Sequence, residues 1–583
     1  MTYTFLWTKR RASCKERHLY NLPASLVFLH ILVLLLSTGC NTAASTLPSP
    51  LVGRYTYTPP AMHGYHGKLV YATTQFPASA NPLFASSSAD LALNAALWGQ
   101  PVFYDQQFHI HPDQLMEVPL PENGGVQDGG KTVLLHLRHD LLWSDGQAIT
   151  ASDFAYWWHL NQNPDTGATT QNGYNQIAQL ETPDPYTVIL HMKHPFGPYL
   201  FYLPYAAPQH IWGKHQPIEL QNIPAIYTAP VVTSGPYKLK SMQDGQSYTL
   251  VPNTQYVSSS FRGPLLAQLT FRSYETTASL VQAVQQHKVE VTAGYIEDEG
   301  ALLTHLPTDV HIAQTLAASY AHLEFNNAKP FFVDVQVRQA IQNAINVCDL
   351  LVSVLHTADC ARRATQVEPQ PSLYHDATIQ PVTYSPASAK RLLQQSGWLP
   401  DAHGILTKNG HAFIIRLVTT QAPLRLAVAA YIQHALQALG IMVQIVSYPL
   451  NTFFDGYTKG GILATGAYDM ALFTYANSPE PDDQYDVFHS SQIPSADYPT
   501  LSNYARINDA AIDSALMMGR NSVAFTDRAV AYHRLLERLA QQVYVVPLYV
   551  ESVTMTVTTR VHNVSPNPNQ AIPTWNVADW WTI

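Results

Sequence analysis

The stretch LLHLRHDLLWSDGQAITASDFAYWW, residues 134–158, places strand, turn and helix signals in immediate succession. Asp145-Gly146 is a dipeptide typical of tight turns. Thr150 and Asp153 have the spacing of a capping box, in which Asp replaces the usual Glu. We therefore predict a strand over residues 132–137, a turn at Asp145, and a helix that begins just after Thr150.

The rest of the chain alternates between strand-like and helix-like patterns. Further strands are predicted at residues 187–192, 248–252, 414–419 and 442–447. Apolar residues with helical spacing predict helices at residues 276–286, 335–345, 386–395, 424–439 and 525–541. Pro386 in a first turn and Gly397 just beyond the end of the same helix agree with capping preferences. A helix, a short loop and a buried strand form the unit of an α/β lobe.

The composition is that of a folded protein with few charges. The 583 residues are 46% hydrophobic and only 13% Asp, Glu, Lys and Arg, about half the usual charged share, which excludes disorder and coiled coil. The net charge is −9, and it becomes −13 without residues 1–39, which carry five basic residues and one Glu. This acidic balance argues against nucleic acid as a partner.

The N-terminal segment predicts export. Basic residues between positions 9 and 17 precede an apolar run at 26–36, which is too short for a comfortable membrane span. The following string LLSTGC resembles a bacterial lipoprotein lipobox, with Cys40 as the lipidated residue and Ser37 where Leu is usual. We expect a signal peptide over 1–39 and a lipid-anchored flexible tether over 40–63. An ordinary signal peptide or an uncleaved anchor is the alternative.

Two of the four cysteines, Cys14 and Cys40, fall in this segment, which leaves Cys348 and Cys360 for the folded part. In an exported compartment these two could form a disulfide. Two free or buried thiols are the alternative.

Catalytic motifs are missing from the sequence. There is no phosphate-binding GxxxxGK loop, no HExxH, no GxSxG and no CxxC. His109 and His111 could share a metal on one strand face, but polar surface histidines are the simpler interpretation. The adjacent carboxylates Asp482 and Asp483 have no identifiable nucleophile beside them. We therefore predict no enzyme, no cofactor and no metal.

The stretch at 134–158 resembles the signature of the family 5 extracellular solute-binding proteins, the oligopeptide, dipeptide and nickel receptors of ABC importers. In that family a strand ends in Leu-Arg, an aromatic-Asp-Gly turn follows, and a helix begins after Thr-Ala-x-Asp. Other stretches resemble family landmarks in the same order, at residues 182–200, 208–212, 233–256, 323–346, 384–398, 468–475 and 575–581. Together they cover nearly all of residues 66–583.

The resemblance implies an α/β, two-lobed periplasmic-binding-protein-like fold of type II, in the large cluster with an inserted extra domain. Lobe I would comprise residues 64–101, 225–320 and 541–583, the inserted domain II residues 102–224, and lobe III residues 321–540. Hinge strands would lie near Ala321 and Gln541. Ligand would close the lobes by hinge motion, and a transporter would recognise the closed form.

The resemblance also indicates a ligand site. In peptide receptors of the family, an Asp four residues before a Pro binds the α-ammonium group of the peptide. The matching string TYANSPEPDDQYDVF, residues 474–488, has Asn477 at this position, so the anionic anchor is missing. Glu480, Asp482 or Asp483 could supply the charge instead. A solvated acidic loop is the alternative for these three residues.

Other candidate ligand-binding residues are less specific. Ser86, Ser87 and Ser88 occupy the place of a first-lobe loop that touches ligand in the family. Tyr475 is a candidate cleft aromatic. Tyr320 and Glu324 lie near the expected hinge strand, where a structural role is the alternative.

These observations predict a monomeric, lipid-anchored substrate-binding protein on the outer face of the cell membrane, with ABC permease and ATPase subunits as partners. Peptides are the first-choice ligand. A nickel chelate or an oligosaccharide is the alternative within the same fold. A sensor or surface chaperone without a transporter is the alternative of another class.

Overall fold

The computed structural model describes residues 50–53, 55, 57–58, 65–292, 306–569 and 572–583. The predicted export signal, Cys40 and most of the predicted tether lie outside these residues. In the described part of the chain, none of the helices combines the length and the apolar character needed to span a bilayer.

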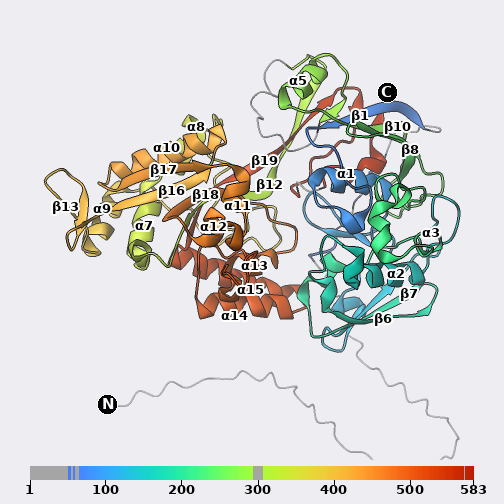
Figure 1. The fold of residues 1–583 in the computed structure, drawn as a ribbon, viewed down its shortest axis with the longest axis horizontal. Coiled ribbons are helices and arrows are strands. Elements are labelled where there is room, and N and C mark those ends of the chain that lie inside the picture. The colour runs from blue at the N-terminus through green and yellow to red at the C-terminus, as the bar shows by residue number, and fades with distance from the viewer. Residues whose placement is uncertain (1–49, 54, 56, 59–64, 293–305, 570–571) are drawn as a thin grey trace, which may run out of the picture. The chain divides into compact units, whose positions relative to one another are not determined.

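A ten-stranded mixed sheet runs through the described chain (Figure 1). Strands β16, β17 and β18 pair in parallel, and so do β10, β1 and β11. Between these two groups stand the long antiparallel strands β12 and β19. In spatial order the strands are β17 (Met442–Tyr448), β16 (Ile414–Thr420), β18 (Met470–Tyr475), β12 (Val310–Phe325), β19 (Val545–Thr558), β11 (Val291–Thr292), β1 (His66–Thr73), β10 (Leu266–Ser273), β9 (Ser247–Pro252) and β8 (Tyr237–Gln243).

Strands β12 and β19 connect the two halves of this sheet. Residues 320–325 of β12 pair with β18, whereas Val557 near the end of β19 pairs with β11. The β12–β19 ladder shifts register between Leu316 and Tyr320, and again at Ala321. The pairing is therefore irregular where the two strands pass from one half to the other.

Strands are present close to both positions where hinge strands are expected, Ala321 and Gln541. Gln541 belongs to the helix α15 (Phe525–Gln542), and β19 begins only at Val545. The helix continues because Leu535, Leu536 and Leu539 keep burying one face of it. It ends at Val543, which adopts a left-handed conformation with φ 50°.

Two large hydrophobic cores lie on different parts of the sheet. One contains Leu69 of β1, Leu269 of β10 and Val557 of β19. The other contains Leu323 of β12, Leu417 of β16 and Leu548 of β19, and helices α7 (Val335–Ala344), α8 (Val347–Ser353), α9 (Pro386–Gln395) and α10 (Pro423–Gln437) contribute to it. The β12–β19 pair supplies residues to both cores and so connects the two α/β halves, as a two-lobed fold requires.

A separate four-stranded antiparallel sheet lies in the middle of the first half of the sequence. Its strand order is β4 (Val126–Gln127), β5 (Thr132–His136), β7 (Thr187–Met192) and β6 (Ile177–Asp184). The predicted helix is α2 (Ala151–Gln162), and Asp153 accepts a hydrogen bond from the backbone N–H of Thr150 at 3.0 Å. This bond confirms the carboxylate half of the predicted capping box.

The remaining predicted elements agree with the structure within a few residues. Helix α9 begins at Pro386, its N-cap Ser385 accepts from the N–H of Ser388, and Gly397 follows with φ 82°. Further helices are α1 (Ser88–Leu97), α5 (Thr277–Gln285), α13 (Asp483–Phe488) and α14 (Ala510–Asn521).

The short helix η5 (Gly197–Tyr202) lies against the end of α14. A Cβ atom at Gly197 would stand 2.3 Å from the carbonyl oxygen of Ser522 and 2.8 Å from that of Gly519. Only a residue without a side chain allows this backbone approach. Residues 197–202 and the α14–α15 segment, more than 300 positions apart in sequence, are therefore in direct contact.

Candidate functional site

The candidate site is the loop that leaves the carboxyl end of β18 and enters α13. Strand β18 lies between β16 and β12, so residues 476–482 emerge beside the irregular stretch of β12. Tyr475 pairs in register with Tyr320 at this point. The structure thus brings together four parts of the chain that are far apart in sequence. They are the loop at 476–482, strand β12, the segment at 366–376, and helices α14 and α15.

Asn477 is held by protein partners on both sides of its amide. Its Nδ2 donates to the carbonyl oxygen of Val367 at 2.7 Å, and its Oδ1 accepts from Nε2 of Gln484 at 3.3 Å. The same Gln484 Nε2 donates to Glu368 at 2.8 Å. Gln484 therefore links Asn477 to the carboxylate of Glu368.

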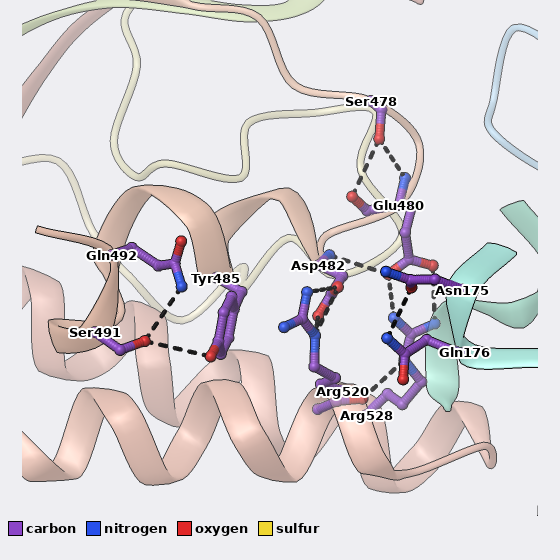
Figure 2. Close-up of polar contacts among 11 residues, drawn as sticks. Asn175, Gln176, Ser478, Glu480, Asp482, Tyr485, Ser491, Gln492, Arg520 and Arg528 are labelled. Atoms are coloured by element: carbon purple, nitrogen blue, oxygen red, sulfur yellow. Dashed lines mark hydrogen bonds and ion pairs between the residues drawn. The ribbon is translucent and has the colours of Figure 1, made fainter. Parts of the chain in front are cut away.

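Glu480 forms a buried ion pair with Arg528 of α15. Arg528 Nη1 donates to Glu480 Oε2 at 3.1 Å, Nη2 donates to Oε1, and Nε donates to the carbonyl oxygen of Gly519 at 3.2 Å (Figure 2). Each residue is only 5% exposed. Burial alone would lower the pKa of Arg528, but the Glu480 carboxylate raises it well above its ordinary value, so the guanidinium stays charged.

Asp482 forms a second ion pair, with Arg520 of α14. Arg520 donates from Nε and Nη2 to Asp482 at 2.8–3.1 Å. Its guanidinium also lies 3.7 Å from the ring centre of Tyr485, a cation–π contact. Asp482 is 5% exposed. Because both Glu480 and Asp482 are buried and paired, a solvated acidic loop does not describe them.

Asp483 and Glu368 are acids without a cationic partner among the described residues. Asp483 is bonded to the N–H of Ser478 at 2.9 Å, and Glu368 accepts from the hydroxyl of Ser372 at 2.7 Å. Burial raises the pKa of Asp483 to about 7 and the pKa of Glu368 to about 8, although these hydrogen bonds oppose the shift. Both groups therefore titrate near neutral pH.

Tyr320, His322 and Glu324 are buried along β12. The His322 ring stacks on Tyr475 at 4.5 Å, and Glu324 accepts hydrogen bonds from the hydroxyls of Tyr468 at 2.8 Å and Tyr475 at 3.1 Å. Tyr320 and Glu324 are both 0% exposed. Burial lowers the pKa of His322, so its ring is neutral at pH 7. These residues form a polar core at the base of the loop.

Ser86, Ser87 and Ser88 are at the N-terminus of α1, where they form a cap. Ser87 is the N-cap residue, and its hydroxyl accepts from the N–H of Asp90 at 3.1 Å. The backbone N–H groups of Ser86 and Ser87 donate in return to the Asp90 carboxylate. Ser88 is the first residue of the helix. The sequence analysis did not predict Asp90 as the partner of these serines in the cap.

The sequence reasoning also missed Glu368, Gln484, Arg520 and Arg528. A signal for Arg528 exists, because it precedes Ala531, Tyr532 and Leu535 by three, four and seven residues and thus lies on the apolar face of its helix. An Arg in such a position implies a buried partner. Nothing in the sequence around Glu368 or Arg520 indicates which residue each one contacts.

The two histidines weighed as metal ligands both face one acid. His111 Nε2 lies 2.8 Å and His109 Nδ1 3.5 Å from Asp105 Oδ2. Across the described ranges, no group of three or more His, Cys, Asp or Glu side chains is placed to hold a metal. In the same part of the chain, Cys348 and Cys360 are unbridged thiols.

Comparison with known proteins defines the family. The profile of the family described as "Bacterial extracellular solute-binding proteins, family 5 Middle" matches residues 119–495, well over half of the chain. The chain belongs to this family. Family 5 is a family of solute-binding proteins, and its members are extracellular. The family resemblance predicted from the strings around residues 134–158 is confirmed.

Relatives and solved structures of family 5 cover nearly the whole chain. The oligopeptide-binding protein AppA of Bacillus subtilis is 24% identical over 544 residues, 88% of this chain and 91% of AppA. The structure of AppA in complex with a nonapeptide superposes with a TM-score of 0.67 at 21% identity, covering 89% of this chain and 99% of AppA. The structure of NikZ from Campylobacter jejuni in complex with Ni(L-His) superposes with a TM-score of 0.70 at 20% identity, covering 88% of this chain and 99% of NikZ. The structure of the periplasmic EDTA-binding protein EppA superposes with a TM-score of 0.74 at 20% identity, covering 90% of this chain and 97% of EppA. These likenesses confirm the predicted fold.

Proposed function

We propose that this family 5 protein is the substrate-binding component of an ABC importer, which captures peptides between two lobes and delivers them to a membrane permease. The similarity to AppA carries the proposal, because it extends over 88% of this chain and 91% of a protein named for oligopeptide binding. The predicted division into lobe I, inserted domain II and lobe III is part of the proposal.

The proposed closure takes place about the β12–β19 pair. Two strands joining two α/β halves offer little resistance to rotation, and their ladder is already irregular between Leu316 and Tyr320. Hinge closure around a ligand is a known motion of binding proteins with such a connection. In this proposal, Asn477 and Tyr475 at the end of β18 contact the ligand.

The charges of the loop favour a second candidate ligand class. The position of the anionic anchor is occupied by Asn477, and Glu480 and Asp482 are already neutralised by Arg528 and Arg520. We assign these two acids to shaping the loop. A solute without an ammonium group, such as a metal chelate or an oligosaccharide, therefore fits this site as an alternative to a peptide with a free N-terminus.

Ligand identity is tested by native mass spectrometry of the protein from its own source, followed by thermal shift against di- to octapeptides, nickel–histidine and EDTA chelates. A ligand present at about 100 times its dissociation constant should stabilise the protein by about 2.7 kcal/mol. Stabilisation by one or more peptides supports the first proposal. Stabilisation by chelates alone would assign the site to a solute without an ammonium group. The absence of a thermal shift with every peptide would refute peptide capture.

Asn477→Asp separates the two ligand classes. If the site receives a peptide N-terminus, the new carboxylate should raise the preference for free over N-acetylated peptides about tenfold, since hydrogen bonds to charged groups are worth about 1–2 kcal/mol more than neutral ones. This ratio is not affected by the lost hydrogen bond from Asn477 to Val367, because both kinds of peptide meet the same altered loop. N-acetylated peptides should gain nothing. Asn172→Asp, which adds the same charge at an exposed position, is the matched control. An equal gain for acetylated peptides would contradict an ammonium site at position 477.

The export signal, the lipid on Cys40 and the partnership with permease and ATPase subunits are further parts of the proposal. A basic segment followed by the apolar run at 26–36 and by Cys40 supports the export signal and the lipid. Membership of family 5 and the similarity to proteins named as ABC transporter peptide-binding proteins support the partnership. Metabolic labelling with a fatty acid should modify the wild-type chain and not Cys40→Ser, which should appear in the culture medium or periplasm. Equal labelling of both would exclude Cys40 as the lipid site.

A further inference from the structure

The parallel strands in the two halves of the large sheet point their carboxyl ends toward each other. Strands β16, β17 and β18 run in the direction of β19, because β18 is antiparallel to β12 and β12 is antiparallel to β19. Strands β1, β10 and β11 run in the opposite direction, because β11 is antiparallel to β19. In open α/β sheets, ligands bind outside the carboxyl ends of the strands. The segments that follow β16, β17 and β18 therefore border the proposed cleft between the lobes.

Helix α11 (Leu450–Phe454) is one of these segments, and it carries exposed apolar side chains. It begins shortly after β17 ends and contacts β16. Leu450 and Phe454 are 62% and 40% exposed, although both are large and apolar. Because they are four residues apart, they lie on the same face of the helix. Phe453 holds the helix on the sheet, since its buried ring packs against the ring of Phe473 at 6.0 Å between centres.

Aromatic rings connect this apolar face to the candidate site. The ring centre of Phe454 lies 5.8 Å from that of Phe473 in β18, and the ring centre of Phe473 lies 5.0 Å from that of Tyr475. Tyr475 is the last residue of β18 and precedes Asn477 by two positions. The exposed face of α11 is thus continuous with the residues that are proposed to contact the ligand.

We propose that Leu450 and Phe454 form an apolar subsite, which receives a branched aliphatic or aromatic side chain of the ligand. The side chains of both residues lack hydrogen-bonding groups, so they favour a partner that leaves water together with them. This inference rests on the proposed capture of peptides between two lobes. It names the class of peptide, one that carries a large apolar residue close to the part that lies at Tyr475.

Binding of two peptides and an apolar dye to the purified full chain tests the subsite. The peptides are trileucine and triserine, measured by calorimetry, and the dye is N-phenyl-1-naphthylamine, whose fluorescence rises in apolar surroundings. Leu450→Asn and Phe454→Asn should each weaken binding of trileucine about tenfold and of the dye about fivefold, because less apolar surface leaves water. Binding of triserine should change less than about twofold, since its side chains bury little apolar surface.

Leu399→Asn is the matched control for Leu450→Asn. Leu399 is 57% exposed, and it lies on β13 (Leu399–Pro400), which belongs to a separate three-stranded sheet. Figure 1 shows β13 at the end of this half that is remote from β12 and β19. The control should bind both peptides and the dye as the wild type does.

The possible results separate this subsite from peptide capture itself. If peptides bind, a lower ratio of trileucine to triserine affinity in Leu450→Asn than in Leu399→Asn supports the subsite. An equal ratio in the two variants overturns the subsite and leaves peptide capture standing. If no peptide binds, peptide capture fails and the dye decides: weaker dye binding in Leu450→Asn than in Leu399→Asn supports an apolar subsite, and equal dye binding overturns it.

Discussion

Arg528→Met removes the cation from the most buried ion pair of the candidate site and leaves Glu480 with a buried, uncompensated charge. The Met side chain keeps most of the apolar volume of the Arg stem, so the variant tests the charge more than the packing. Arg528 is 5% exposed and makes three side-chain hydrogen bonds, two to Glu480 and one to the carbonyl oxygen of Gly519. We expect the free energy of unfolding to fall by about 3–5 kcal/mol.

The magnitude follows from burial, because water cannot replace the lost guanidinium. The neighbouring pair provides the comparison, since the Arg520 side chain is 27% exposed while Asp482 is 5% exposed. Water can partly solvate Asp482 once Arg520 is removed, so Arg520→Met should cost about 1–2 kcal/mol. The two substitutions are chemically identical and differ mainly in the exposure of the pair.

Urea denaturation followed by tryptophan fluorescence measures both variants, and a double-mutant cycle isolates the pair. Glu480→Gln should destabilise the protein by itself, because it strands the Arg528 charge. In the double variant the second substitution should cost much less than it does alone. Strictly additive costs, or a loss below about 1 kcal/mol for Arg528→Met, would refute the assignment of a strongly coupled buried pair.

Three further substitutions test other parts of the structure. Glu368, whose pKa of about 8 lies above its ordinary value of 4.5, keeps its proton in the folded state where the unfolded chain has lost it. Glu368 should therefore make stability fall by about 2 kcal/mol between pH 6 and 8, in addition to the smaller loss from Asp483, whose pKa is about 7. Thermal melts should show the full loss in the exposed-site control Glu537→Gln and a clearly smaller loss in Glu368→Gln; parallel pH profiles would contradict it. Gly197→Ala puts a methyl group 2.3 Å from the carbonyl oxygen of Ser522. Calorimetry should therefore record a destabilisation of about 1–3 kcal/mol. An unchanged melting temperature would mean that this contact is not tight. Ser87→Ala removes the side-chain cap of α1 and should lower the free energy of unfolding by about 1 kcal/mol in urea titrations. An unchanged free energy would show that the cap does not stabilise the fold.

Local elements could be predicted from the sequence because their signals lie within a few residues of one another. The strand at 132–137, the helix after Thr150 and the helix at Pro386 depend on turn dipeptides, caps and apolar periodicity, and all of them are present. The helix predicted at 525–541 has the same origin, because its apolar periodic face continues to Leu539.

The candidate site could be predicted only as a place in the chain. The string at 474–488 identified the loop after β18 and the missing carboxylate at Asn477. It did not predict the partners of the loop, because Glu480 and Arg528 are 48 residues apart and Asn477 and Val367 are 110 residues apart. A hydrogen-bond partner at such separation depends on how helices pack against a sheet, which no local pattern records.

The sequence by itself determined the family and the alternation of strands and helices, because the signals for both lie in neighbouring residues. Only the tertiary structure decided which charges of the site are free. Glu480, Asp482 and Asp483 are all acids of one short string, yet the first two lie against guanidinium groups from α15 and α14, and Asp483 accepts a hydrogen bond from the N–H of Ser478 in its own loop. Charge neutralisation depends on distance in space, and that distance is set by packing.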